Sequence, residues 1–86
     1  MTEISFYTNE MRRAVHSIDA PKNFGISIAE HSDNGVLLFI EVIADEQDFI
    51  RLDHQGKLDA LRYMLKVKSA LEDNGAVVQL TRKAIQ

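Results

Sequence analysis

Three histidines are the first residues in this 86-residue chain whose chemistry suits a metal ion or proton transfer. They are His16, His31 and His54. A zinc motif brings further ligands within a few residues on one face of the chain, but no second histidine lies close to any of the three, and the chain has no cysteine. We therefore predict no metal site and no cofactor, and interpret each histidine as a solvated surface residue.

Acidic side chains cluster at Asp45, Glu46 and Asp48, where they could attract a hard cation. The glycine and the spaced ligands of a calcium loop are missing. We interpret the cluster as a solvated turn, with an acidic surface for a basic partner as the alternative. Glu41 interrupts a strongly apolar stretch, so either that end of the sheet is open to solvent or Glu41 pairs with a basic residue such as Arg51.

No arrangement of a nucleophile, a base and a shaped turn is visible, and the glycines do not form a phosphate-binding loop. The absence of cysteine excludes disulfides and cysteine nucleophiles. We therefore predict that the protein is not an enzyme. The alternative in this class is a small enzyme whose site forms between subunits around Glu41 or a histidine.

The charge balance argues against nucleic acid as the partner. Thirteen acidic and ten basic residues give a net charge of -3, whereas nucleic-acid-binding domains usually carry a strongly basic face. A nucleic-acid-binding regulator with a basic helix face remains an alternative. Its candidates are the basic residues of the predicted helices and of the C-terminal segment: Arg12, Arg13, Lys57, Arg62, Lys66, Lys68, Arg82 and Lys83.

The apolar runs are all shorter than the roughly 18 residues that span a bilayer. The N-terminal segment carries an acid and lacks the apolar core of a secretory signal. We therefore expect a cytoplasmic protein that does not enter a membrane.

The elements that position these residues are organised around the segment 36–44, in which only Glu41 is polar. Its β-branched and aromatic residues predict a central strand. The dipeptide Asn34–Gly35 before it predicts a type I′ hairpin with a strand over 24–29. Pairing across that turn sets Ile28 opposite Glu41, and the face that carries the small residues of the first strand becomes a bed for a helix.

Four further elements follow from periodicity and capping. Apolar residues at steps of three and four, starting at Ile4, predict a helix that is firmest over 8–18. A short third strand is predicted over 49–52, a long helix over 54–73 with Asp53 as its N-cap, and a fourth strand over 76–82. The fold class predicted for the single domain 1–86 is thus a two-layer α+β sandwich of order α-β-β-β-α-β, with a mostly antiparallel four-stranded sheet and two helices.

The long helix has more apolar surface than one sheet needs. One row contains Ala60, Met64, Val67 and Leu71, and a second row contains Leu58, Leu61 and Leu65. Both rows together form a broad core face, unless the second row binds a partner. Alternatively, the first helix packs on the second row and buries it.

From this surplus we predict a small protein-interaction module that acts as an adaptor, regulator or inhibitor and also self-associates as a homodimer. The predicted contact residues are Leu58, Leu61 and Leu65, with Arg62 at the rim.

Overall fold

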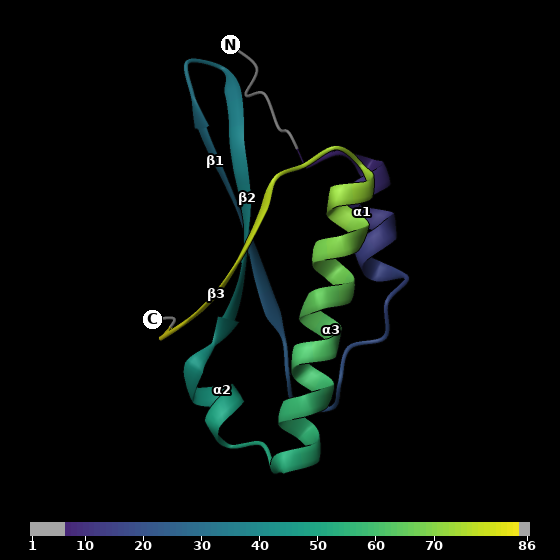
Figure 1. The fold of residues 1–86 in the computed structure, drawn as a ribbon, viewed down its shortest axis with the longest axis vertical. Helices are drawn as coiled ribbons and strands as arrows, with labels where there is room; N and C mark the ends of the chain where they lie inside the picture. Colours follow the sequence, from purple (N-terminus) through teal and green to yellow (C-terminus); the bar gives the residue numbers. More distant parts are fainter. Residues whose placement is uncertain (1–6, 85–86) are drawn as a thin grey trace.

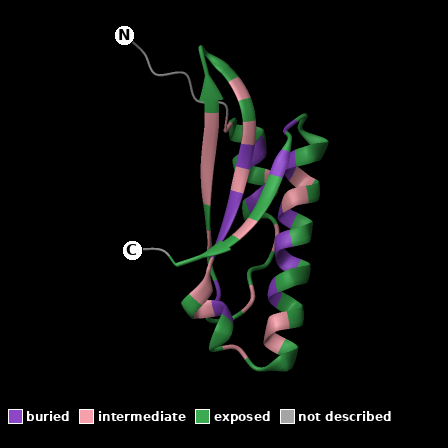
Figure 2. Cartoon of the chain, turned by 60° about the vertical axis from the view of Figure 1, so that its left-hand side comes forward, coloured by how far each residue is buried: buried purple, intermediate pink, exposed green. Residues whose placement is uncertain are grey.

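The computed structural model describes residues 7–84 and has an α+β fold with a sheet whose helices pack on one face (Figure 1). The three strands are β1 (Ile26–Asp33), β2 (Val36–Asp45) and β3 (Val78–Lys83). The three helices are α1 (Asn9–His16), α2 (Glu46–Ile50) and α3 (His54–Asp73). Figure 2 shows the opposite face of the sheet, which none of the helices within residues 7–84 covers.

The sheet is mixed and has the order β1-β2-β3, so β2 is its central strand as predicted. Strand β2 pairs antiparallel with β1 and parallel with β3. The prediction of a mostly antiparallel four-stranded sheet with two helices is therefore wrong. The error lies in one segment, because the third strand predicted over 49–52 does not form there.

Helix α2 takes the place of that strand. The side chain of Asp45 accepts a hydrogen bond from the backbone N–H of Gln47 at 3.1 Å and caps the helix. The acidic side chains of Glu46 and Asp48 lie in the first turn, where the helix dipole favours negative charge. Burial of Phe49 holds the short helix against the core. The acidic cluster is thus a helix start.

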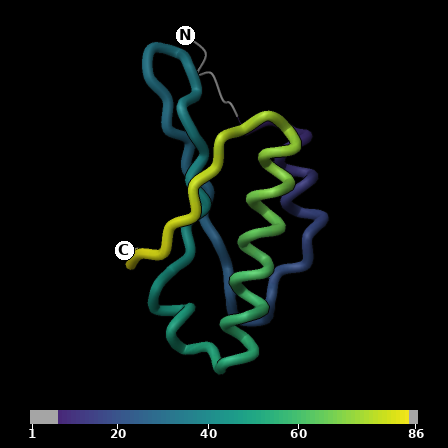
Figure 3. The backbone as a smooth tube through the Cα atoms, in the orientation of Figure 1, coloured from purple at the N-terminus to yellow at the C-terminus, as the bar shows by residue number. Residues whose placement is uncertain are grey.

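Replacing a strand by a helix changes the route of the chain. From the end of β2 the backbone passes through α2 and α3 and returns as β3 (Figure 3). This crossover returns the chain to the end of the sheet at which β2 begins, so β3 runs parallel to β2. Strand β3 pairs with β2 on the side away from β1. The outer side of β3 is therefore an edge of the sheet.

The hairpin turn has the predicted geometry. Asn34 and Gly35 both adopt a positive φ, 52° and 79°, as a type I′ turn requires. The predicted register is nevertheless wrong by one residue, because an irregularity between His31 and Ser32 shifts the pairing. Ala29, not Ile28, lies opposite Glu41.

This shift exchanges the two faces of β1, since a slip of one residue turns every side chain over. Ile26 and Ile28 now lie opposite Ala44 and Val42 and pack against the core. Ser27 and the other small side chains of β1 lie on the open face, so the prediction that a helix packs on these small residues is wrong.

Both predicted helices form. Thr8 caps α1 and its hydroxyl accepts from Met11 N at 3.2 Å, but the helix ends at His16, before the predicted end at 18. Ile4, the first residue of its predicted stripe, lies outside the described residues. Helix α3 has the predicted bounds, and its N-cap Asp53 accepts from Gly56 N at 2.7 Å.

The core lies between the sheet and the helices. Helix α3 contributes Leu71, one of the largest fully buried side chains among the described residues. Helix α1 packs along α3 with Met11 and Val15. The buried residues of α3 are Ala60, Tyr63, Met64, Val67 and Leu71. The first apolar row of the long helix is thus the core row, as predicted.

Candidate functional site

The second apolar row of α3 is exposed to solvent. The exposed fractions are 37% for Leu58, 45% for Leu61 and 57% for Leu65. In the part of the chain that the structure describes, α1 packs on α3 without covering these leucines. The rival explanation, in which the first helix completes the burial of this row, does not hold.

Strand β3 extends this apolar row. Leu80 of β3 is 37% exposed and lines an open groove of about 380 Å³ together with Leu61 and Met64 of α3. Thr81 and Arg82 complete the groove. Figure 1 shows α3 and β3 next to each other on the side of the molecule that faces the reader. We call Leu58, Leu61, Leu65 and Leu80 the α3–β3 surface.

Ion pairs at the border of the α3–β3 surface fix its polar side chains. The Arg82 guanidinium lies 2.7 Å from the carboxylate of Glu46 and 4.4 Å from the ring centre of Phe49. On α3, Lys68 bonds Glu72 at 2.9 Å. An apolar centre with a charged rim is the usual composition of a protein-binding patch.

Arg62, the fourth predicted contact residue, lies at the rim that faces away from β3. Its side chain is 3.8 Å from Asp59 and borders a shallow groove with Pro21 and Lys66. The structure thus brings Leu61 together with Leu80, which the sequence reasoning did not select, and leaves Arg62 outside the groove that these two leucines line. Leu58 and Leu65 are exposed in the same row of α3 as Leu61. Leu80 could have been found only after β3 had been placed at the edge of the sheet.

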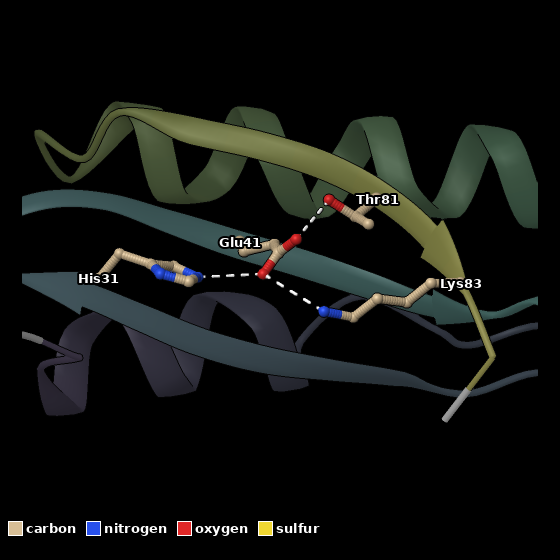
Figure 4. A network of polar contacts seen from close by, with 4 residues as sticks. All are labelled: His31, Glu41, Thr81 and Lys83. Carbon is tan, nitrogen blue, oxygen red and sulfur yellow. Dashed lines mark hydrogen bonds and ion pairs between the residues drawn. The ribbon is translucent and has the colours of Figure 1, made fainter. Parts of the chain in front are cut away.

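A polar network on the open face of the sheet is the second candidate (Figure 4). The Glu41 carboxylate accepts a hydrogen bond from the Thr81 hydroxyl at 2.6 Å and lies 3.0 Å from His31 Nε2. The ammonium group of Lys83 is 3.9 Å away. Glu41 therefore links all three strands through side chains. The predicted partner, Arg51, is not among these contacts.

These contacts also set the charge of Glu41. The hydrogen bond from Thr81, and then that from His31, lower the pKa of Glu41 below its ordinary value of 4.5, against a smaller opposing effect of desolvation. Glu41 is therefore ionised at neutral pH and is a weak proton acceptor. Its contacts suit a structural role, in which they hold the three strands together, better than the role of a catalytic base.

The three histidines lie on three different elements, α1, β1 and α3. The ring of His31 stacks on Phe39 with 4.3 Å between the centroids and contacts Glu41, while 42% of its side chain stays exposed. It is therefore a surface histidine, as predicted, but one with side-chain partners. His16 and His54 are exposed on α1 and α3. Among residues 7–84, no group of three or more His, Asp or Glu side chains is arranged to hold a metal ion.

Two sizeable grooves, of about 540 and 520 Å³, lie away from these groups. One groove of about 520 Å³ lies between the turn at Pro21 and the start of α3, where Gly56 and Asp59 line it. Neither Glu41 nor a histidine lines this groove. The alternative of a catalytic site that forms between subunits around Glu41 or a histidine stays a prediction, because one copy of the chain does not test it.

The basic residues do not form an uninterrupted face. Four of the eight candidates have acidic partners: Arg62 with Asp59, Lys68 with Glu72, Arg82 with Glu46, and Lys83 with Glu41. Because these pairs neutralise much of the positive potential that phosphate binding needs, the nucleic-acid alternative gains no support.

Comparisons with protein-family models, with curated proteins and with solved structures found no match for the chain. Among the helices of residues 7–84, none combines the length and the apolar character that crossing a membrane requires.

Proposed function

We propose that this protein acts by binding another protein through the α3–β3 surface, as an adaptor, regulator or inhibitor. The observation that carries the proposal is that Leu61 and Leu80 line one apolar groove while Leu65, in the same row of α3 as Leu61, is exposed to solvent. Single exposed leucines are common, but leucines that gather on two adjacent elements usually mark an interface.

The leucines have the placement of binding residues. They project from α3, whose opposite side is held in the core by Val67 and Leu71, both fully buried. A rigid helix loses little conformational freedom on binding, so burial of its leucines translates efficiently into affinity. Apolar side chains near the middle of a patch, surrounded by polar ones, contribute most of the binding energy in such contacts.

The test is capture of partners from an extract of the protein's own cells, in the presence of nuclease. The double variant Leu61→Glu/Leu65→Glu removes the apolar centre of the surface. Lys66→Glu is the matched control, because it changes the net charge by the same two units on an exposed part of the same helix. Circular dichroism verifies that all three proteins are folded.

We expect the wild type and Lys66→Glu to retain the same protein partner and the double variant to lose it. Equal capture by the double variant would contradict the proposal, since a charged pair at these positions should prevent docking. A partner that disappears with nuclease in every sample would favour nucleic acid instead.

A further inference from the structure

The outer edge of β3 carries unpaired backbone groups next to the apolar groove. Ile40 N donates to Val77 O at 2.8 Å, and the register pairs Ile40 with Val78. In a parallel ladder, alternate residues direct both backbone groups to the same neighbour. The N–H and C=O groups of Val78, Leu80 and Arg82 therefore point away from β2, and among the described residues no strand pairs with them.

We infer that the partner of this edge is a second copy of the chain, with the two β3 strands paired antiparallel about a twofold axis at Leu80. This inference rests on the proposed function, since it names the occupant of the α3–β3 surface. A symmetric dimer requires a surface that is complementary to itself. Both parts of the α3–β3 surface meet this requirement under the same axis.

Strand β3 is complementary to its own copy because its outward-pointing residues are symmetric about Leu80. An axis at Leu80 places Leu80 opposite its own copy and Val78 opposite Arg82 of the other chain. These are the residues whose backbone groups point outward, so all of these groups gain hydrogen-bond partners. In this register each residue lies opposite a residue whose side chain points to the same face of the sheet. The helices of both copies therefore lie on the same side of the resulting six-stranded sheet.

Helix α3 is complementary to its own copy through its row of leucines. Leu61 borders the same groove as Leu80, so the axis passes close to Leu61. The two α3 helices then run antiparallel, and this arrangement brings Leu58 of one copy toward Leu65 of the other. The spacing of the row, three residues on one side of Leu61 and four on the other, therefore sets leucine against leucine.

Charge and area are compatible with this arrangement. Arg82 lies opposite Val78 and Thr81 opposite Gln79, so no like charges face each other across the strands. The four leucines expose 37 to 57% of their surface, roughly 300 Å² per copy if an extended leucine exposes about 180 Å². A stable interface needs about 800 Å² from each partner, and the strand edge with the stems of Lys57 and Lys68 is available for the remainder.

The test uses the absence of cysteine from the chain. The variant Leu80→Cys places one thiol on the axis, where the Cα atoms of a hydrogen-bonded antiparallel pair are about 5.5 Å apart. That separation suits a disulfide, which needs about 4.4 to 6.8 Å. Oxidised glutathione accepts the two electrons and two protons that the thiols release. The controls are Gln79→Cys, which lies opposite Thr81 and not opposite itself, and Val36→Cys at the exposed hairpin.

We expect light scattering to give twice the chain mass for the wild type and the single mass for Leu61→Glu/Leu65→Glu. We expect Leu80→Cys to form a disulfide-linked dimer at least tenfold faster than either control. A wild type that stays monomeric up to millimolar concentration would overturn the inference, as would equal rates for the three cysteines.

The failure of this inference and the failure of the proposed function are distinguishable. A monomeric wild type that still captures a protein through Leu61 and Leu65 would refute the dimer and leave the proposed function standing. A monomeric wild type whose captured proteins are the same with and without the leucines would refute both.

Discussion

The two apolar rows of α3 should respond in opposite ways to the same truncation. Leu71 is fully buried in the core row, whereas Leu65 in the second row is 57% exposed. Both lie on one helix and both change to alanine, so the chemistry is identical and only the environment differs.

The magnitudes follow from burial. Truncating a fully buried leucine costs about 2–5 kcal/mol of unfolding free energy, because the contacts are lost and a cavity remains. For a chain of this length the total is only about 4–13 kcal/mol, so Leu71→Ala removes a large share of it. An exposed leucine makes few such contacts, and alanine favours a helix, so Leu65→Ala should change the free energy by at most about 0.5 kcal/mol.

The assay is urea unfolding followed by circular dichroism at the lowest protein concentration that gives a signal, since self-association would add stability. With a slope of about 1.5 kcal/mol per molar urea, Leu71→Ala should lower the midpoint by ~1–3 M. Leu65→Ala should leave it nearly unchanged. A midpoint for Leu65→Ala as low as that for Leu71→Ala would show that the second row is core and would refute the reasoning.

Three further predictions concern single contacts. Gly75 follows α3 with φ at 91°, so Gly75→Ala should lower the free energy of unfolding, measured with urea, by about 1 kcal/mol. Gly25 lies at an open position without positive φ, so Gly25→Ala should leave the free energy of unfolding unchanged, and equal effects of the two variants would contradict this reasoning. Loss of the N-cap in Asp53→Ala should cost about 0.5–2 kcal/mol by thermal unfolding, and an unchanged midpoint would show that the cap is dispensable. Thr81→Val should raise the pKa of Glu41, as followed by carboxyl NMR, because Thr81 lowers it most; an unchanged pKa would exclude that hydrogen bond. Since a lowered pKa means that the folded state favours the ionised form, the contribution of Glu41 to stability is complete above its ordinary pKa of 4.5 and is lost as the pH falls through the lowered value.

Local signals with a clear physical basis predicted much of the fold. Asn34 and Gly35 take the positive φ values that their types allow, and the capped, periodic helix α3 begins and ends where predicted. The four residues 49–52 were too few for periodicity to distinguish helix from strand. The signal for α2 was nevertheless present, since Asp45 followed by acidic residues is a typical helix start.

Long-range features could not be read from the chain. The irregularity between His31 and Ser32 leaves no mark in the sequence, yet it decides which face of β1 meets the helices. The contacts of Glu41 with His31 and Thr81 depend on that register and on the position of β3. The three leucines of the second row could be predicted because they share one helix, whereas Leu80 joins them only through the tertiary fold.

The most direct test of the central claim, that the α3–β3 surface binds protein, is photo-crosslinking at single positions. A benzophenone amino acid is introduced in place of Leu65 or, as the control, in place of its neighbour Lys66, and each protein is irradiated in an extract of its own cells. We predict strong protein adducts from position 65, with a second copy of the chain or with another protein, and weak ones from position 66. No adducts at either position, or equal adducts at both, would contradict the claim.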